Sequence, residues 1–390
     1  MRITTTMMIR NYQTNLSATT ENKMNYQNKV LTQRNFTSVK EDPSAAAKAS
    51  HLTRQYLKNE DYLEMSKDLQ SKLDSQEDSV YQVVKYAEEL FAKIGKESLN
   101  GTNLEQRETY ANTIVSIRDS ILQSLNAVYS NTFIMAGANG TEAPFSIDDT
   151  TGKLMYNRGT AGGTEVDDQA NIEQLKKWRD EALYMDIGLG LEFGPDANGN
   201  KGQGDEIISS TAFNIAFSGL SAIWNDSDAA ENSTIVTGAL GKTSLKIEVG
   251  NNTINSLEAQ SYRAAIANGE GKNHMANNLV DLCSQLALEL LQPDEEFDYQ
   301  SCDEMLTKMK KFHEQADNSL TGIGVKSDFL EKSIDRMESN ELSLATQLER
   351  VVTPDMAIAI TNYSYAQYAY NAALRIGVNL LSQSFLDFMR

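Results

Sequence analysis

Apolar and small polar side chains recur at alternating steps of four and three residues over two long stretches of the chain. The first repeat runs from Leu52 to Ile94, six heptads without interruption, and the second runs from Met305 to Leu348. A 4-3 repeat places its members along one side of an α-helix, as in coiled coils. Each stretch is therefore predicted to form one long amphipathic helix that packs along a partner helix.

Start signals precede these helices and predict three more. Asp42-Pro43 lies before the first repeat, and Thr353-Pro354-Asp355 follows the second, as a cap, a first-turn proline and an acid near a helix N-terminus. A helix is expected to begin after each signal. Another is expected after "LNGTN", and "NIEQLKKWRDEAL" predicts a short one with Trp178 on its apolar face.

The two terminal helices differ from the others because they carry few charges. From Tyr363 to the end, the only charged residues are Arg375, Asp387 and Arg390. A helix that is neutral almost all round must be buried on more than one side. It is either the central core helix of one domain or a helix that packs within its chain and against neighbouring subunits, and its terminal position favours the second.

We expect both terminal helices to be loose in the monomer and to order upon assembly. The predicted assembly interface takes residues from a 4-3 row on each helix. Its members are Ile9, Tyr12, Leu16, Met24, Leu31, Ile360, Tyr363, Tyr370, Leu374, Leu381 and Phe388.

The middle of the chain has a different composition. Residues 147–271 are rich in Gly, Asn, Asp and Thr, and "SLKIEV" alternates as a strand does. From Ile147 to Glu270 there are 19 acids and 9 bases. The predicted fold is mainly α: an elongated antiparallel helical bundle or coiled-coil rod, formed by the N- and C-terminal segments, with an inserted β-rich domain. The predicted domains are a terminal assembly domain (1–42 and 353–390), a helical rod domain (43–146 and 272–352) and the surface-exposed insert (147–271).

Charge and cysteine content exclude several classes of protein. A net charge of −19 argues against nucleic-acid binding, which needs clustered bases. The most apolar stretch, Met356 to Leu374, contains five Thr, Asn, Ser or Gln residues, so no membrane insertion is predicted. The N-terminus lacks the features of a secretory signal peptide. Cys283 and Cys302 are expected to be buried or half-buried thiols, since their spacing suits neither a disulfide framework nor a zinc site.

Motifs for chemistry fail at defined positions. "GALGKTS" lacks the first glycine of a phosphate-binding loop, because Val236 stands there. "DANGNKGQGDEI" lacks the sixth-position glycine and the twelfth-position glutamate of a calcium loop. The three histidines are scattered along the chain. We therefore predict no enzyme and no catalytic, cofactor-binding or metal-binding residues.

Several blocks, in order at both ends of the chain, resemble the bacterial flagellin superfamily. They are "MRITTTMM", "VKEDPSAAAKASHLTRQ", "YANTIVSIRDSILQSLNAVYSNTFIMAGANGTEAPF" and "GVKSDFLEKSIDRMESNELSLATQLERVVTPDMAIAITNYS". The ending "AALRIGVNLLSQSFLDFM" is more similar to the hook–filament junction branch than to flagellin itself. The likeness covers residues 1–146 and 275–390. One departure is Gln33-Arg34-Asn35-Phe36, where the family often has a glycine-containing turn.

The resemblance implies a structural protein that leaves the cell through the flagellar export apparatus and resides in the extracellular flagellum. Its implied partners are identical subunits in a ring, the neighbouring hook-associated protein, flagellin, and a cytoplasmic export chaperone that binds the C-terminal helix. Two alternatives stay open. One is a filament-forming flagellin; the other is a secreted coiled-coil adhesin, whose ligand could bind near "SGLSAIW" in the middle domain.

Overall fold

A computed structural model describes residues 5–94, 102–148, 153–158, 163–166, 169–195, 204, 206–225, 275–292, 294 and 297–388. The chain divides into two compact units. Unit 1 comprises Met1–Leu63 and Asp335–Arg390, and unit 2 comprises Glu64–Ile334. Long helices make up most of both units, which confirms the predicted mainly α fold with small sheets in an inserted region.

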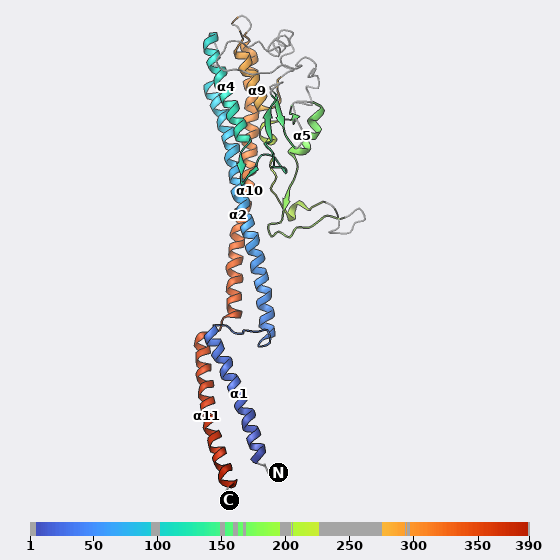
Figure 1. Ribbon diagram of the computed structural model, residues 1–390. Helices are drawn as coiled ribbons and strands as arrows, with labels where there is room; N and C mark the ends of the chain where they lie inside the picture. The colour runs from blue at the N-terminus through green and yellow to red at the C-terminus, as the bar shows by residue number, and fades with distance from the viewer. Residues whose placement is uncertain are drawn as a thin grey trace. The chain divides into compact units, whose positions relative to one another are not determined.

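Unit 1 is built around two terminal helices. Helix α1 (Thr5–Thr32) packs along helix α11 (Met356–Phe388) in antiparallel orientation, so that the two ends of the chain lie at the same end of the pair (Figure 1). The unit also holds the first part of α2 (Pro43–Lys93) and the last part of α10 (Tyr299–Val352). Helix α2 begins at the predicted signal, where the Ala45 N–H donates to the Asp42 carboxylate (2.9 Å).

The predicted 4-3 rows on α2 and α10 face each other, and their polar members pair across the seam. In unit 1, the Tyr56 hydroxyl donates to Glu341 (3.0 Å) and the Asn59 amide donates to the Met337 carbonyl (2.8 Å). In unit 2, the Gln70 amide donates to the Ser327 hydroxyl (2.6 Å). Every member of both rows is buried or half-buried. Polar pairs inside such a seam fix the register of two helices, at some cost in stability.

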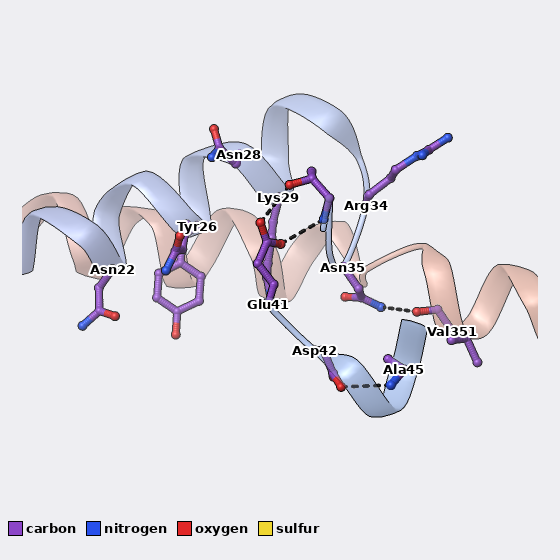
Figure 2. Close-up of a pocket in the computed structure, with 12 residues that line it drawn as sticks. Asn22, Tyr26, Asn28, Lys29, Arg34, Asn35, Glu41, Asp42, Ala45 and Val351 are labelled. Carbon is purple, nitrogen blue, oxygen red and sulfur yellow. Dashed lines mark hydrogen bonds between the residues drawn. The ribbon is translucent and has the colours of Figure 1, made fainter. Parts of the chain in front are cut away.

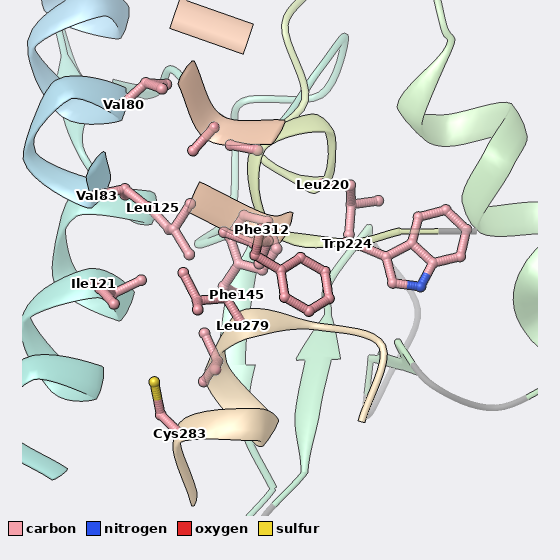
Figure 3. Packing of buried hydrophobic residues seen from close by; sticks show 14 of the residues in the cluster. Val80, Val83, Ile121, Leu125, Phe145, Leu220, Trp224, Leu279, Cys283 and Phe312 are labelled. Atoms are coloured by element: carbon pink, nitrogen blue, oxygen red, sulfur yellow. The ribbon is translucent and has the colours of Figure 1, made fainter. Parts of the chain in front are cut away.

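Unit 2 has a continuous hydrophobic core. Helices α4 (Leu104–Leu125) and α9 (Leu279–Leu290) pack against each other, and residues of α2 and α10 join the same cluster (Figure 3). Helix α4 starts at a capping box formed by Asn103 and Gln106. All but one of the residues of α9 are buried, so this helix shows no amphipathic period, and the sequence pattern did not identify it.

The inserted region contains short antiparallel strands. Strands β1 (Val128–Tyr129) and β2 (Thr132–Phe133) form a hairpin, and β6 (Tyr184–Met185) pairs with β7 (Phe213–Asn214). A three-stranded sheet has the order β3-β4-β5, and the short helices of the region include the predicted one around Trp178. The remaining bounds are β3 (Phe145–Ile147), β4 (Leu154–Tyr156), β5 (Thr164–Glu165), η1 (Gln169–Asn171), α5 (Ile172–Arg179), η2 (Ser209–Thr211) and α6 (Leu220–Ile223).

The stretch "SGLSAIW", considered above under the adhesin alternative, contributes to the core of unit 2, where Leu220, Ile223 and Trp224 are fully buried. Hydrogen bonds hold the stretch in place: the Gln315 amide of α10 donates to the carbonyls of Ser221 (2.8 Å) and Trp224 (2.6 Å). The motifs "SLKIEV" and "GALGKTS", and most of "DANGNKGQGDEI", lie outside the described residues.

Candidate assembly surface

Small side chains on α11 form the seam against α1. Ala359 and Ala366 are buried, and Gly377 lies directly beneath the ring of Tyr12. A Cβ atom at Gly377 would overlap with that ring and its hydroxyl. The hydroxyl of Tyr12 donates to the carbonyl of Ala373 (3.1 Å). Because the seam residues are small, the backbones of the two helices approach closely, and one tyrosine fixes their register.

Two tyrosines of α11 flank this seam. Tyr363 and Tyr370 are half-buried, and the ammonium of Lys23 lies 4.6 Å from the centroid of the Tyr370 ring, in a cation–π contact. The Tyr363 hydroxyl donates to Gln367 within the same helix (3.4 Å). These tyrosines place apolar rings against α1 while their hydroxyls reach polar atoms or water.

The predicted interface residues divide between this seam and the surface. Ile9, Tyr12, Leu16, Tyr363 and Tyr370 are half-buried, whereas Met24, Leu31, Ile360 and Leu374 are exposed; the side chains of Leu381 and Phe388 are outside the described part.

The predicted interface row from Ile360 to Phe388 only partly coincides with the side of α11 that faces α1, because Ile360 and Leu374 are exposed; their role in assembly stays a prediction. The row that faces α1 is Ala359, Tyr363, Ala366, Tyr370, Ala373 and Gly377. Its spacing is also four and three, so period alone could not choose between the two rows. The smaller residues face inward because only they let α1 approach.

Large apolar side chains are exposed on both flanks of α11. Ile358, Tyr365 and Ile376 lie on one flank and are 59%, 71% and 55% exposed. Ile360, Leu374 and Val378 recur on the other flank and are also exposed. Steps of seven, eleven or fourteen residues return to the same helix face, so each set forms a continuous apolar strip. Together these six residues are named the α11 strips.

The connector between α1 and α2 surrounds a polar hollow of about 510 Å³. Figure 2 shows how Asn35 crosses to the end of α10, where its side-chain amide donates to the carbonyls of Val351 (3.0 Å) and Thr353 (3.2 Å). The Asn35 backbone N–H donates to the Val352 carbonyl (2.7 Å). One side chain therefore ties the α1–α2 connector to the α10–α11 junction.

Two further residues shape the connector. The backbone N–H and the hydroxyl of Thr37 both donate to the Glu41 carboxylate. These two bonds, the backbone one most strongly, hold the pKa of that carboxyl below its ordinary value. Gln33 follows the last residue of α1 with φ at +55°, in the left-handed region where glycine is favoured. At this position a glutamine therefore adopts the conformation that glycine adopts most easily.

Within the part of the chain that the structure describes, no group of three or more His, Cys, Asp or Glu could hold a metal ion. Cys283 and Cys302 are free and fully buried, as predicted, and burial raises the pKa of the Cys283 thiol to about 12. No helix among the residues searched is long and apolar enough to cross a membrane. The small residues of the α1–α11 seam support close packing between helices.

Comparisons with known proteins agree with this arrangement. Residues 3–140 match the family model of the bacterial flagellin N-terminal helical region. A solved structure of a proposed flagellar hook-associated protein from Vibrio parahaemolyticus matches with a TM-score of 0.51 and 14% sequence identity, over 80% of this chain and 100% of that one. No curated protein sequence matches the chain. The structural match shows a shared fold, and the match to the family model is confined to the N-terminal part of the chain.

Proposed function

We propose that the chain is a non-enzymatic structural subunit of the bacterial flagellum, and that it forms part of the junction between hook and filament. The flagellin-type N-terminal region and the fold shared with a proposed flagellar hook-associated protein support the flagellar context. The ending "AALRIGVNLLSQSFLDFM", similar to junction proteins, favours the junction over the filament.

The α11 strips are the single observation that carries an assembly role. Helix α11 has only two charged residues, Arg375 and Asp387, in a chain of net charge −19. Identical copies of a strongly acidic protein repel one another, and a neutral apolar helix is where they can pack without that penalty. Six exposed large side chains on such a helix would be an aggregation hazard in a free monomer, which indicates that a partner covers them.

In this proposal the terminal helices of neighbouring copies pack against the α11 strips in a ring. The ring contacts the neighbouring hook-associated protein on one side and flagellin on the other. Before export, a cytoplasmic chaperone covers α11, and the chain leaves through the flagellar export apparatus. The two terminal segments form the assembly domain, the α2 and α10 helices belong to the rod domain, and the insert lies at the outside of the assembly.

Deletion of residues 353–390 tests the proposal. We expect the shortened protein to remain folded and soluble and to resist proteases better than the full chain, while it no longer assembles. The measurement is incorporation into flagella and recovery of swimming in cells that lack their own copy of the protein. Global unfolding of the shortened protein would show that α11 is an ordinary core helix, and the proposal would be wrong.

A sharper variant keeps the helix and changes only its surface. Ile358→Ser, Tyr365→Ser and Ile376→Ser remove one α11 strip, whereas Leu342→Ser alters a residue of α10 that is 72% exposed and lies outside both strips. We expect loss of assembly from the triple variant and none from the control, with unchanged helix content by circular dichroism in both. Flagella that assemble normally from the triple variant would contradict the role of this strip.

The filament-forming flagellin is the second candidate, since the matched N-terminal model is named for flagellin. Seeded polymerisation separates the two. Purified flagellin is expected to extend filament seeds into long filaments, whereas a junction subunit is expected to bind a seed and stop.

A further inference from the structure

Charge is distributed unevenly along α2. Residues 43–59, the basic segment, contain Lys48, Arg54 and Lys58, one histidine and no acid. Residues 60–78, the acidic segment, contain seven acids and two bases. The whole chain has 54 acids and 35 bases, and the basic segment borders the acidic segment on the same helix.

The bases of the basic segment are exposed along α2. Lys48, Arg54 and Lys58 follow one another at steps of six and four residues, and all three are exposed. Arg54 lies on the side of the helix opposite Leu52 and Asn59, which face α10, whereas Lys48 lies one turn before Leu52 at the edge of the seam. The three charged side chains therefore form a strip that is open to a partner outside the helix pair.

None of these bases has an acidic partner in the described part of unit 1. The one contact that is found is a cation–π contact of the Lys58 ammonium with the Tyr62 ring (5.3 Å). In the acidic segment, Glu60, Glu64 and Asp68 are exposed at steps of four residues and form no ion pair with a described residue. Two strips of opposite sign, both unpaired, follow one another along a single helix.

We propose that the basic segment of one copy docks on the acidic segment of α2 in a second copy of this chain. Two identical α2 helices aligned side by side in register would place bases against bases and acids against acids. A shift of about three helical turns along the axis places opposite charges together. The contact is heterologous, so it can repeat from copy to copy. This inference rests on the proposed function, because it assigns a second contact between assembling subunits.

The contact mainly sets the register between the two α2 helices and adds little to the free energy of association. Exposed ion pairs contribute little individually, but like charges in the wrong register are disfavoured, and complementary charges speed encounter. Because both strips are exposed, the interaction must weaken as salt shortens the screening length. The α11 strips, being apolar, respond to salt in the opposite direction or not at all. Salt dependence therefore separates the two contacts.

The test is the association constant of the full chain by sedimentation equilibrium at low and high salt. K48E/R54E/K58E is expected to associate about tenfold more weakly than wild type at low salt, since three pairs become repulsive. E60K/E64K/D68K is expected to weaken association similarly. An equimolar mixture of the two variants is expected to associate more strongly than either alone, and the chain that carries both triplets is expected to regain the wild-type constant.

K85E/K93E/K310E is the matched control, because it reverses three exposed bases outside the basic segment and changes the net charge equally. Equal association of wild type and K48E/R54E/K58E at low salt would overturn the inference, as would a wild type whose association is unaffected by salt. A different result would overturn the proposed function itself. If that function were wrong, deletion of residues 353–390 would leave assembly intact, whatever the effect of the charge variants.

Discussion

The two helix pairs α4/α9 and α1/α11 are packed in different ways. The α4/α9 pair belongs to a core in which large side chains such as Leu125 and Ile121 are fully buried within one chain. The α1/α11 pair is held by alanines, a glycine and half-buried tyrosines, and it leaves the α11 strips exposed. Unit 2 completes its hydrophobic core alone, whereas the pair in unit 1 has apolar surface left for a partner.

Mutations in the core of unit 2 should therefore have the largest effect on the stability of the isolated chain. Phe312→Ala removes a ring that is 1% exposed and is expected to cost about 3–5 kcal/mol in the free energy of unfolding. Phe329→Ala, on the same helix, removes a ring that is 44% exposed and stacks on Phe213 at 6.0 Å, so its cost should be about 1 kcal/mol.

Urea unfolding followed by circular dichroism measures both values. Leu374→Ala extends the comparison to unit 1, since this side chain is 40% exposed and should cost little in the monomer while it weakens assembly. If Leu374→Ala destabilised the monomer as much as Phe312→Ala, the contrast between the two units would be wrong.

The seam of unit 1 should be most sensitive at its glycine. Gly377→Ala introduces a methyl group that overlaps with Tyr12, and we expect the α1–α11 pairing to weaken by about 1–3 kcal/mol as the ring is displaced. Gly322→Ala in α10 is the control, because nothing lies near its Cβ position and the change should stabilise that helix by about 0.5–1 kcal/mol.

Limited proteolysis reports on the pairing. Faster removal of α1 from Gly377→Ala than from wild type is the expected result, with no acceleration in Gly322→Ala. Equal rates in all three proteins would mean that Tyr12 does not fix the register of the pair.

The buried thiols of Cys283 and Cys302 make the stability of unit 2 depend on pH in the alkaline range. Burial raises the pKa of Cys283 to about 12 and raises the pKa of Cys302 as well, so the folded protein keeps both protons longer than the unfolded chain. Their contribution to stability is full below the unfolded-state pKa near 9 and is lost as the pH rises toward the folded-state pKa. At pH 10 the loss is about 1.4 kcal/mol per thiol.

Other groups in unit 2 titrate in the same range, so the variant Cys283→Ala/Cys302→Ala provides the reference. The difference in unfolding free energy between wild type and this variant should shrink by about 3 kcal/mol between pH 7 and pH 10. A thiol reagent at pH 8 should label neither cysteine in the folded protein. Rapid labelling of either one would show that it is not buried.

The sequence predicted the parts of the fold that depend on local periodicity. The rows from Leu52 to Ile94 and from Met305 to Leu348 lie in the α2–α10 seam, and even their polar members, such as Gln70 and Ser327, meet there. Helix α9 was not predicted, because a helix that is buried on every side has no polar face and therefore shows no hydrophobic period.

Long-range partners had no sequence signal either. Arg107 is 2% exposed and donates to the carbonyls of Leu290 (3.2 Å) and Gln292 (2.8 Å), so it satisfies the end of a helix almost two hundred residues away. On α11, the row that contains Ile360 and the row that contains Ala359 have the same spacing, so the sequence did not show which one faces α1. Only the contact of Tyr12 with Ala373 shows that the row of Ala359 faces inward. Such choices depend on the partner, which periodicity does not specify.

The smallest expected effect concerns Gln33, a residue other than glycine at a backbone position that favours glycine. With φ at +55°, this residue adopts a conformation that disfavours side chains with a Cβ atom. Gln33→Gly should therefore stabilise the end of α1 by about 0.5–1 kcal/mol, since the relief of strain exceeds the added freedom of the unfolded chain. Hydrogen exchange of the last turn of α1 should slow by a few-fold, whereas Gln33→Ala, which keeps the Cβ atom, should leave it unchanged. Faster exchange in Gln33→Gly would mean that the glutamine side chain itself holds the turn, and that the left-handed conformation carries no strain.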